Sequence, residues 1–395
     1  MQRVAASVAW LLGVCATGAL AEQKAPAWIE EGPYFPAGQV ELEIPIQVFA
    51  DKLYLSVDIG GSPRRFVFDT GSPSMISASL AEALELPVVD RRSGIDAHGN
   101  IVESDIVQVD LSIAGQVFHR LPAFAADFDQ SPAAQCFIGD GVLGADVLPL
   151  CAWQVDRSAG VLRCHTHRET LPGLEYAKAL RLYDFGYPHI PFVDVQYSEH
   201  ARSKVMIDTG ATGLFALSQA DHDGIKKHDD FRNVGRGQGS AGSSLGGPAP
   251  DRPQVRVLLD SVTLESLDLG PVVASVRPIP PSLLGAPLFR QYRVTLDVSS
   301  QQAFLEPVGT TPEVSTNLGF QLGFDDEVSV ALVWEDSPAA KAGLKVGQSI
   351  TAINGQSTDT SCDGMRFALE AMSGDTIELA WPGGSATLTR APWPN

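Results

Sequence analysis

One internal repeat constrains this chain more than any other feature of its sequence. Residues 66–72 read FVFDTGS and residues 205–211 read VMIDTGA, so an apolar run ends twice on an acid, a hydroxyl and a glycine. Two aliphatic residues and a glycine follow each copy, VLG at 142–144 and LLG at 283–285. The spacing is 75 positions from Asp69 to Gly144 and 77 positions from Asp208 to Gly285. Self-similarity at matched spacing predicts two copies of one structural unit.

Each copy is predicted to be rich in short β-strands. Alternating apolar and polar residues, separated by turn residues, predict strands in both copies. In the first copy they cover residues 53–58, 65–68, 106–113, 153–156 and 161–164, and in the second 192–196, 204–207, 255–259, 292–297 and 303–306. Only residues 79–85 have a helical pattern. Many short strands at regular spacing favour a β-barrel-like or sandwich unit.

The two acids raise a problem of charge. An aspartate in a turn often caps its own loop, and this interpretation would suffice for one copy. It explains the pair less well, because each apolar run leads its carboxylate into a place where a charge is costly unless it is compensated. Two such carboxylates related by a two-fold axis would compensate by sharing a proton, so that one pKa falls and the other rises.

The repeated pattern of two apolar residues, Asp-Thr-Gly and a later apolar-apolar-Gly resembles the aspartic proteases, above all bacterial retropepsin-like proteins with two lobes fused in one chain. The resemblance covers roughly residues 44–307. It implies a mainly β fold with two tandem pseudo-symmetric lobes, at 40–170 and 171–308. It also implies that Asp69 and Asp208 hold one water, which the ionised acid deprotonates while the other hydrogen-bonds the scissile carbonyl. No covalent intermediate, metal or cofactor is expected.

The resemblance assigns supporting roles to the neighbours of the two acids. The two threonines would exchange hydroxyl hydrogen bonds across the lobes, and the two glycines would leave the backbone room near the acids. These residues are Thr70, Thr209, Gly71 and Gly210. Ser72 could hydrogen-bond the outer oxygen of Asp69, whereas Ala211 could not do so for Asp208. This asymmetry predicts that Asp69 is the more readily ionised acid.

A protease of this kind also needs a flap over its substrate. Two glycine-containing segments are candidates, residues 94–100 (GIDAHGN) and residues 235–247 (GRGQGSAGSSLGG). Neither contains a tyrosine. The alternative interpretation of both is an ordinary exposed loop, in which His98 would be solvated rather than catalytic.

The composition changes after Pro307, where residues 309–316 are predicted to be a linker. The segment that follows, within residues 317–395, resembles a small α+β PDZ domain. The resemblance places a carboxylate-binding loop at Leu318, Gly319 and Phe320, with Asn317 where the family has a leading glycine. It implies that a peptide or protein C-terminus adds as a strand beside a second helix, at residues 367–372. Alternatively, the domain only packs against the lobes.

The N-terminus and the net charge indicate where the chain works. Residues 1–21 have one cation, an apolar run and the small residues Ala19 and Ala21, the layout of a cleaved secretory signal. An uncleaved anchor over residues 4–21 is the alternative. The formal net charge of −19 argues against binding to nucleic acid or to an anionic membrane. The expected location is therefore the periplasm or the extracellular space.

An oxidising compartment permits disulfides. One bridge is expected among Cys136, Cys151 and Cys164, with Cys362 as a small buried residue on its own. His165 and His167 are two apart on a predicted strand and could face one metal ion, but no third ligand is evident.

The sequence thus favours an exported, monomeric aspartic endopeptidase that acts on polypeptides, with a PDZ domain that recruits substrate or gates the cleft. Two alternatives stay open. One is a non-catalytic peptide-binding protein that keeps the protease fold, and the other is a narrow processing enzyme for one partner.

Overall fold

The computed structural model describes residues 25–36, 38–128, 132–228, 230–309 and 316–393. The expected signal segment, residues 1–21, lies outside the described residues, as do residues 310–315 of the expected linker. Strands dominate the described chain, so the expected mainly β class is confirmed. No helix in these ranges is long and apolar enough to cross a membrane.

The first repeat forms an eight-stranded sheet in the order β2-β3-β4-β9-β5-β8-β7-β6. Its central feature is a parallel pair in which Phe66 lies opposite Gly141 and Phe68 opposite Leu143. The side chains of Phe66, Phe68 and Leu143 are buried in the core. The strands are β2 (Gln47–Phe49), β3 (Lys52–Ile59), β4 (Ser62–Phe68), β5 (Met75–Ser77), β6 (Val88–Ile95), β7 (Ile101–Ile113), β8 (Gln116–Ala126) and β9 (Gly141–Leu143).

The second repeat has the same local arrangement. Its parallel pair places Met206 opposite Leu283 and Asp208 opposite Gly285. In both repeats a short strand, β5 or β15, runs antiparallel to one member of that pair and parallel to a third strand. The main strands are β13 (Phe192–Gln196), β14 (Arg202–Asp208), β15 (Phe215–Ser218), β16 (Arg232–Gly239), β19 (Arg252–Leu259), β22 (Val272–Arg277) and β23 (Leu283–Gly285), with short β17 (Ser243–Ser244), β18 (Gly247–Pro248), β20 (Thr263–Leu264) and β21 (Leu267–Asp268).

Close approach of the backbone explains why both apolar-apolar segments end on glycine. A Cβ on Gly144 would lie 2.5 Å from the carbonyl oxygen of Ser72, in the loop after the first Asp-Thr-Gly. A Cβ on Gly285 would lie 2.6 Å from the carbonyl oxygen of Ala211, in the second such loop. Each glycine therefore lets the end of one strand pack against the loop that carries the acid.

A shared sheet joins the two repeats. Hairpin strands β10 (Ala152–Asp156) and β24 (Tyr292–Asp297) pair antiparallel, with Gln154 opposite Thr295. Those two residues are counterparts in the repeat, so the pseudo-two-fold axis passes between them. The outer strands are β1 (Glu41–Pro45), β11 (Val161–His165), β12 (Lys178–Tyr183) and β25 (Gln302–Pro307).

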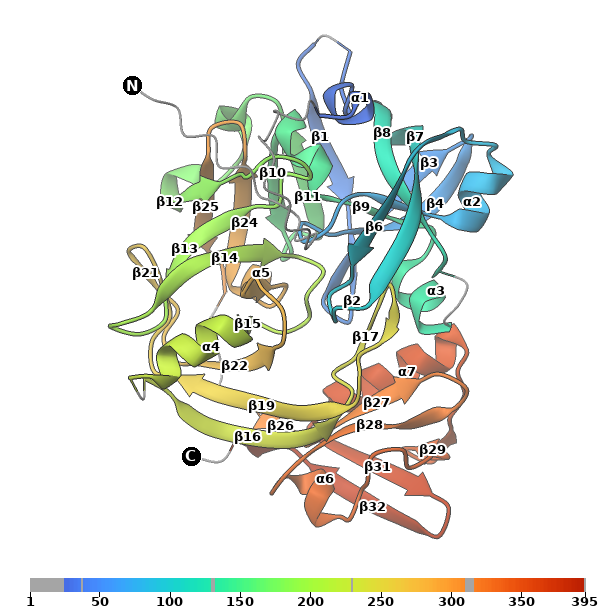
Figure 1. Cartoon of the computed structure of the whole chain (residues 1–395), viewed down its shortest axis with the longest axis vertical. Helices are drawn as coiled ribbons and strands as arrows, with labels where there is room; N and C mark the ends of the chain where they lie inside the picture. Colours follow the sequence, from blue (N-terminus) through green and yellow to red (C-terminus); the bar gives the residue numbers. More distant parts are fainter. Residues whose placement is uncertain (1–24, 37, 129–131, 229, 310–315, 394–395) are drawn as a thin grey trace, which may run out of the picture.

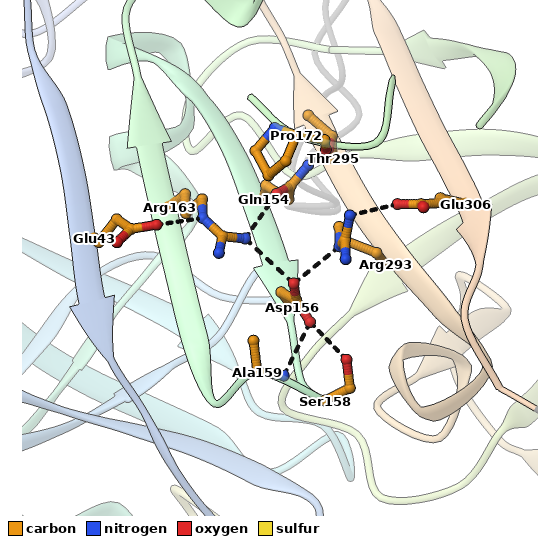
Figure 2. Close-up of polar contacts among 10 residues, drawn as sticks. All are labelled: Glu43, Gln154, Asp156, Ser158, Ala159, Arg163, Pro172, Arg293, Thr295 and Glu306. Carbon is orange, nitrogen blue, oxygen red and sulfur yellow. Dashed lines mark hydrogen bonds and ion pairs between the residues drawn. The ribbon is translucent and has the colours of Figure 1, made fainter. Parts of the chain in front are cut away.

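Buried charges reinforce this sheet (Figure 2). Asp156 is 2% exposed, and its carboxylate forms ion pairs with Arg293 at 2.9 Å and Arg163 at 3.3 Å. Its other oxygen accepts from the Ser158 hydroxyl and the Ala159 amide. Because the two arginines come from different repeats, the network ties the halves of the chain together.

Helices are more numerous than the sequence pattern predicts. The expected helix is present as α2 (Ala78–Ala83). The expectation that it is the only one in the repeats is wrong, because α3 (Pro132–Ile138) and α4 (Gln219–Lys226) also form. Both are short: α4 begins at the capping hydroxyl of Ser218, as α2 does at Ser77, and buries His222 and Ile225. Short helices also form at α1 (Ala27–Glu30) and α5 (Leu288–Gln291).

The C-terminal domain is a small α+β unit. It has β26 (Thr316–Asn317), β27 (Phe320–Phe324), β28 (Val328–Trp334), β29 (Ala352–Ile353), β30 (Gln356–Ser357), β31 (Thr376–Trp381), β32 (Gly384–Thr389) and β33 (Ala391–Pro392), with α6 (Pro338–Lys341) and α7 (Cys362–Ser373). The helix expected at residues 367–372 is the second half of α7.

This domain is joined to the second repeat by main-chain pairing. Residues Gly237 and Gly239 of β16 lie opposite Trp334 and Leu332 of β28, and the Glu335 amide donates to the Arg236 carbonyl at 2.7 Å. In Figure 1 the long hairpin of β16 and β19 therefore continues into the orange strands of the C-terminal domain. Arg256 lies beside this pairing, with its guanidinium 4.9 Å from the ring centre of Trp334.

Two disulfides form among the described residues. Cys151 pairs with Cys164, which confirms one bridge within the group of three. Cys136 of α3 pairs with Cys362, the first residue of α7, so the expectation that Cys362 stands alone is wrong. The partners are 226 positions apart, and only the docking of the C-terminal domain against α3 brings them together.

Candidate active site

The two acids lie at the tips of the parallel strand pairs. Asp69 follows β4, and its amide donates to the Leu143 carbonyl at 3.0 Å. Asp208 is the last residue of β14 and lies opposite Gly285. The same β-strand pairing therefore delivers each carboxylate to the boundary between the repeats.

The two threonines exchange hydrogen bonds across that boundary. The Thr70 hydroxyl donates to the Ile207 carbonyl at 2.7 Å and accepts from the Thr209 amide at 3.1 Å. The Thr209 hydroxyl donates to the Phe68 carbonyl at 2.7 Å and accepts from the Thr70 amide at 3.0 Å. Both threonines are fully buried. Four reciprocal hydrogen bonds in a dry environment hold the two loops at one separation.

The carboxylates converge over these threonines. The Gly71 amide donates to Asp69 Oδ1 at 2.9 Å, and the Gly210 amide donates to Asp208 Oδ1 at 2.8 Å. A Cβ on Gly210 would lie 2.6 Å from Asp69 Oδ1. Each carboxylate thus lies against the loop of the other repeat, where only a glycine leaves space.

The family comparisons agree with this geometry. Residues 55–147 match the family model described as aspartyl protease, and residues 329–381 match that of the PDZ domain. The chain carries an aspartyl protease domain and a C-terminal PDZ domain. The protease match includes Asp69 and the Val142-Leu143-Gly144 segment, while Asp208 lies between the two matches. A search of curated proteins found no match.

The electrostatics of the protease domain favour a proton on Asp208. Burial raises the pKa of the Asp208 carboxyl, and the neighbouring charge of Asp69 raises it further. The Gly210 amide and the positive charge of Lys52 act in the opposite direction. Lys52 also donates to the Gly210 carbonyl at 2.9 Å. Sequence reasoning missed Lys52 because it begins β3 directly after a turn and carries no motif.

Ser72 does not have the role expected of it. Its hydroxyl is buried and has no hydrogen-bond partner among the described residues, so the expected bond to Asp69 is wrong. Asp69 Oδ1 accepts from the Gly71 amide instead. On the other side, the Ala211 amide adds a hydrogen bond to Asp208 Oδ1 at 3.1 Å.

A buried acid that sequence reasoning missed supports the first loop. Asp146 is 2% exposed and accepts hydrogen bonds from the Ser74 amide at 2.8 Å and from the Ser74 hydroxyl at 2.5 Å. The Ser74 hydroxyl in turn accepts from the Gly144 amide. Burial raises the pKa of Asp146 to about 7, although the Ser74 hydrogen bonds oppose it. The difference between Gly144-Ala145-Asp146 and Gly285-Ala286-Pro287 was the available signal.

Both expected flap segments form hairpin tips. The tip at residues 96–100 joins β6 to β7 and is called flap 1 below; the tip at residues 240–251, which includes β17 and β18, joins β16 to β19 and is called flap 2. The two tips are in contact, because Asp96 Oδ2 accepts from the Gly246 amide at 3.0 Å. Asp96 is 9% exposed. Flap 1 is therefore not an ordinary exposed loop.

The histidines show no metal-binding arrangement. His165 is buried on β11 and its Nδ1 lies 2.6 Å from the Thr170 hydroxyl, while His167 precedes a short 3₁₀ turn. Among the described residues, no three His, Cys, Asp or Glu side chains cluster as they would around a metal ion. His98 is half-buried at the tip of flap 1, and its burial lowers its pKa.

The expected carboxylate loop of the PDZ domain lies at the start of β27. Gly319 has a φ of +91°, and its carbonyl accepts from the Trp334 amide at 2.8 Å. Asn317 instead belongs to β26, and its side-chain amide donates to the Ala391 carbonyl. Helix α3 lies at the opposite end of the domain, where Phe137 contacts Phe324 at the end of β27. With the Cys136–Cys362 bridge, α3 therefore covers the end of α7 and β27 farthest from this loop.

Proposed function

We propose that this chain is an exported aspartic endopeptidase that hydrolyses peptide bonds with water held between Asp69 and Asp208. The observation that carries the proposal is the reciprocal hydrogen bonding of Thr70 and Thr209, which holds the two acid loops together. The effect of Asp69 on the pKa of Asp208 supports a pair that shares one proton. Two acids in the ionisation states that general acid–base catalysis requires are thus available.

In the proposed reaction, ionised Asp69 takes a proton from the water as its oxygen bonds to the scissile carbonyl carbon. Protonated Asp208 donates a hydrogen bond to the carbonyl oxygen and transfers its proton as that oxygen becomes a hydroxyl. The tetrahedral intermediate then collapses: Asp69 gives its proton to the leaving nitrogen, the C–N bond breaks, and Asp208 regains the hydroxyl proton. Both acids return to their starting states, and no acyl-enzyme forms.

The proposed organisation has a signal peptide at residues 1–21, lobes at 40–170 and 171–308, a linker at 309–316 and the PDZ domain at 317–395. The two disulfides support an exported location, in the periplasm or outside the cell, because such bonds persist in oxidising compartments. Two lobes in one chain make a monomer sufficient, since both acids come from the same molecule.

The PDZ domain is proposed to bind a peptide or protein C-terminus through Leu318, Gly319 and Phe320, and to control flap 2. Main-chain pairing of β16 with β28 supports this coupling, because any displacement of β28 acts on the hairpin that carries flap 2. The contact between the two flap tips favours a variant of the proposal, a narrow processing enzyme that opens only when its partner occupies the PDZ domain.

The test is cleavage of a diverse peptide library from about pH 3 to pH 8 by the unmodified protein and by the Asp69→Asn and Asp208→Asn variants, after all three are shown to fold. Loss of cleavage in both variants supports the proposal. Full activity of Asp208→Asn would refute it. If no peptide is cleaved, the library is tested again with added C-terminal peptides that bind the PDZ domain. If there is still no cleavage, a non-catalytic peptide-binding protein is favoured.

A further inference from the structure

Two arginines lie together near Asp208, under the flap tips. Arg277 ends β22, and its guanidinium donates to the Pro281 carbonyl at 2.7 Å and to the Ala97 carbonyl of flap 1 at 3.2 Å. Burial lowers the pKa of Arg277, attraction to Asp208 opposes this, and repulsion from Arg252 adds to it. Arg252 begins β19, next to flap 2. The charges of both arginines also lower the pKa of His98, so the two guanidinium groups and the His98 ring are neighbours.

Neither arginine forms an ion pair with a carboxylate among the described residues. A guanidinium has five N–H donors, and the bonds of Arg277 go to two neutral carbonyls. Within the described ranges, no carboxylate forms an ion pair with Arg252 or Arg277, and the Arg252 side chain has no hydrogen bond. A partly buried cation without an anion costs free energy that a bound anion would recover.

The acids nearby are already engaged. Asp96 Oδ1 accepts from the His98 and Asn100 amides, and Oδ2 accepts from the Asn100 side chain and the Gly246 amide. Asp208 accepts from two main-chain amides and belongs to the acid pair. Neither acid is therefore free to form an ion pair with the arginines, whereas the carboxylate of a bound peptide could do so.

A purely structural role does not account for both arginines. Arg277 ties flap 1 to the loop at Pro281, which explains its place but leaves donors unused. The Arg252 side chain forms no hydrogen bond or ion pair among the described residues, yet it lies close enough to Arg277 for their charges to repel. The formal charge of the whole chain is −19, so this local positive charge runs against the general character of the protein.

We propose that Arg252 and Arg277 form a subsite that binds a carboxylate of the peptide substrate beside Asp208. The planar guanidinium matches a carboxylate through paired hydrogen bonds. That carboxylate comes from a Glu or Asp side chain or from the C-terminus of the peptide. The inference rests on the proposed function for its substrate class, but a binding measurement tests it without turnover.

The experiment uses peptide pairs that differ only by Glu or Gln at one position, scanned along the peptide, each made with a free and with an amidated C-terminus. Binding to the full-length Asp69→Asn protein is measured by calorimetry, and cleavage is measured with Asp69 intact. The subsite variants are Arg252→Gln and Arg277→Gln. The matched control is Arg232→Gln, which removes an exposed charge paired with Asp260 at 3.2 Å, in another part of the hairpin.

The expected result is about tenfold tighter binding of one carboxylate-bearing peptide than of its neutral partner, the size of one charge-assisted hydrogen bond. The preference disappears in both subsite variants and persists in Arg232→Gln. A preference for Glu over Gln would show that the bound carboxylate is a side chain. A preference for the free over the amidated end would show that it is the C-terminus of the peptide. If Arg277→Gln does not fold, Arg252→Gln decides alone, because its side chain has no hydrogen bond to lose among the described residues.

Equal binding of all charged and neutral partners, or a preference unchanged by both subsite variants, would overturn the inference. Its failure is distinct from failure of the proposed function. If the protein cleaves peptides but shows no preference for a carboxylate, only the subsite proposal is refuted. If it binds carboxylate-bearing peptides preferentially but cleaves none, only the proposed protease function is refuted.

Discussion

Gly71 lies against the carboxylate of Asp208, so that a Cβ on Gly71 would lie 2.6 Å from Asp208 Oδ1. Gly210 has the same relation to Asp69. Each acid is therefore positioned by a residue of the other repeat as well as by its own strand. This reciprocal packing leads to the first prediction.

Gly71→Ala is expected to displace the Asp208 carboxylate and to lower kcat/KM by about 100-fold, since catalysis is sensitive to displacements near 1 Å. Overpacking should also cost about 1–3 kcal/mol of unfolding free energy. Gly213→Ala is the matched control, because a Cβ there meets nothing within 4 Å and the residue lies in the second loop. Peptide cleavage and urea unfolding measure both effects; equal activity of the two variants would contradict the prediction.

The raised pKa of Asp208 predicts where activity is lost with pH. In the proposed mechanism the pair works with one proton, and burial and the charge of Asp69 raise the pKa of Asp208 above the usual range of an aspartate. The alkaline limb of kcat/KM should therefore lie above about pH 4. Lys52→Met removes a charge that lowers this pKa and should move the limb to higher pH. Lys345→Met, an exposed change in the PDZ domain, should leave the limb in place.

Asp146 predicts a pH-dependent stability that is separate from catalysis. Its pKa is raised by burial from 3.8 to about 7, so the folded protein binds this proton more tightly than the unfolded chain. The stability that this carboxyl contributes is full below about pH 4 and is lost as the pH rises toward 7, at about 1.4 kcal/mol per pH unit in that window.

Asp146→Asn removes the titrating group, so the difference in unfolding free energy between it and the unmodified protein should change steeply between pH 4 and pH 7. Urea unfolding at several pH values measures this difference. His189 and Tyr187 interact electrostatically with Asp146 and are kept unchanged. A difference that is constant with pH would show that Asp146 stays ionised when the protein folds.

The pairing of β16 with β28 predicts that the PDZ domain and flap 2 can be uncoupled. Gly239 has a φ of +134°, and a Cβ there would overlap the Ala331 carbonyl, so Gly239→Ala should break this ladder. Peptides that bind the PDZ domain should then no longer change the cleavage rate, and amide exchange should accelerate at residues 237–240. Gly224→Ala in α4, where a Cβ meets nothing, is the control. If PDZ ligands still change the cleavage rate of the Gly239→Ala variant, the β16–β28 pairing does not couple the PDZ domain to flap 2.

The Cys136–Cys362 bridge predicts limited access to the PDZ groove. Replacing both cysteines by serine should free α3 from α7, strengthen binding of longer C-terminal peptides and cost about 2–4 kcal/mol of unfolding free energy. Fluorescence anisotropy with peptides of increasing length measures the effect. If peptide length has no influence on the gain in affinity, α3 does not cover the groove.

The features that the sequence predicted are those encoded locally or by repetition. The Asp-Thr-Gly loops, their hairpins and the antiparallel strands follow from alternation and from matched spacing, and Thr70 and Thr209 meet as the repeat implied. Contacts between distant segments were missed. Lys52 contacts Gly210 only because the two repeats pack together, and Cys136 reaches Cys362 only because the C-terminal domain docks on the first repeat. No local pattern encodes such partners.

Ser72 shows a different limit of sequence reasoning. A hydroxyl next to an acid suggests a hydrogen bond, but the Ser72 hydroxyl has no hydrogen-bond partner among the described residues, and Asp69 accepts instead from the main-chain amide of Gly71. Similarly, Arg277 carries no motif, and the role proposed for it depends on its having no carboxylate ion-pair partner among the described residues. This property depends on residues that are distant in the sequence, so the adjacent residues do not predict it.

The disulfide between Cys136 and Cys362 also closes the polypeptide into a covalent ring. The ring contains Asp208, both arginines of the proposed subsite and the whole of flap 2, while Asp69 lies on the open N-terminal arm. A single cut anywhere between the two cysteines, including one made by the protein in its own flap, would open the ring without releasing a fragment. Nicked molecules would keep both acids and the PDZ domain on one covalent assembly until a reductant separates the pieces.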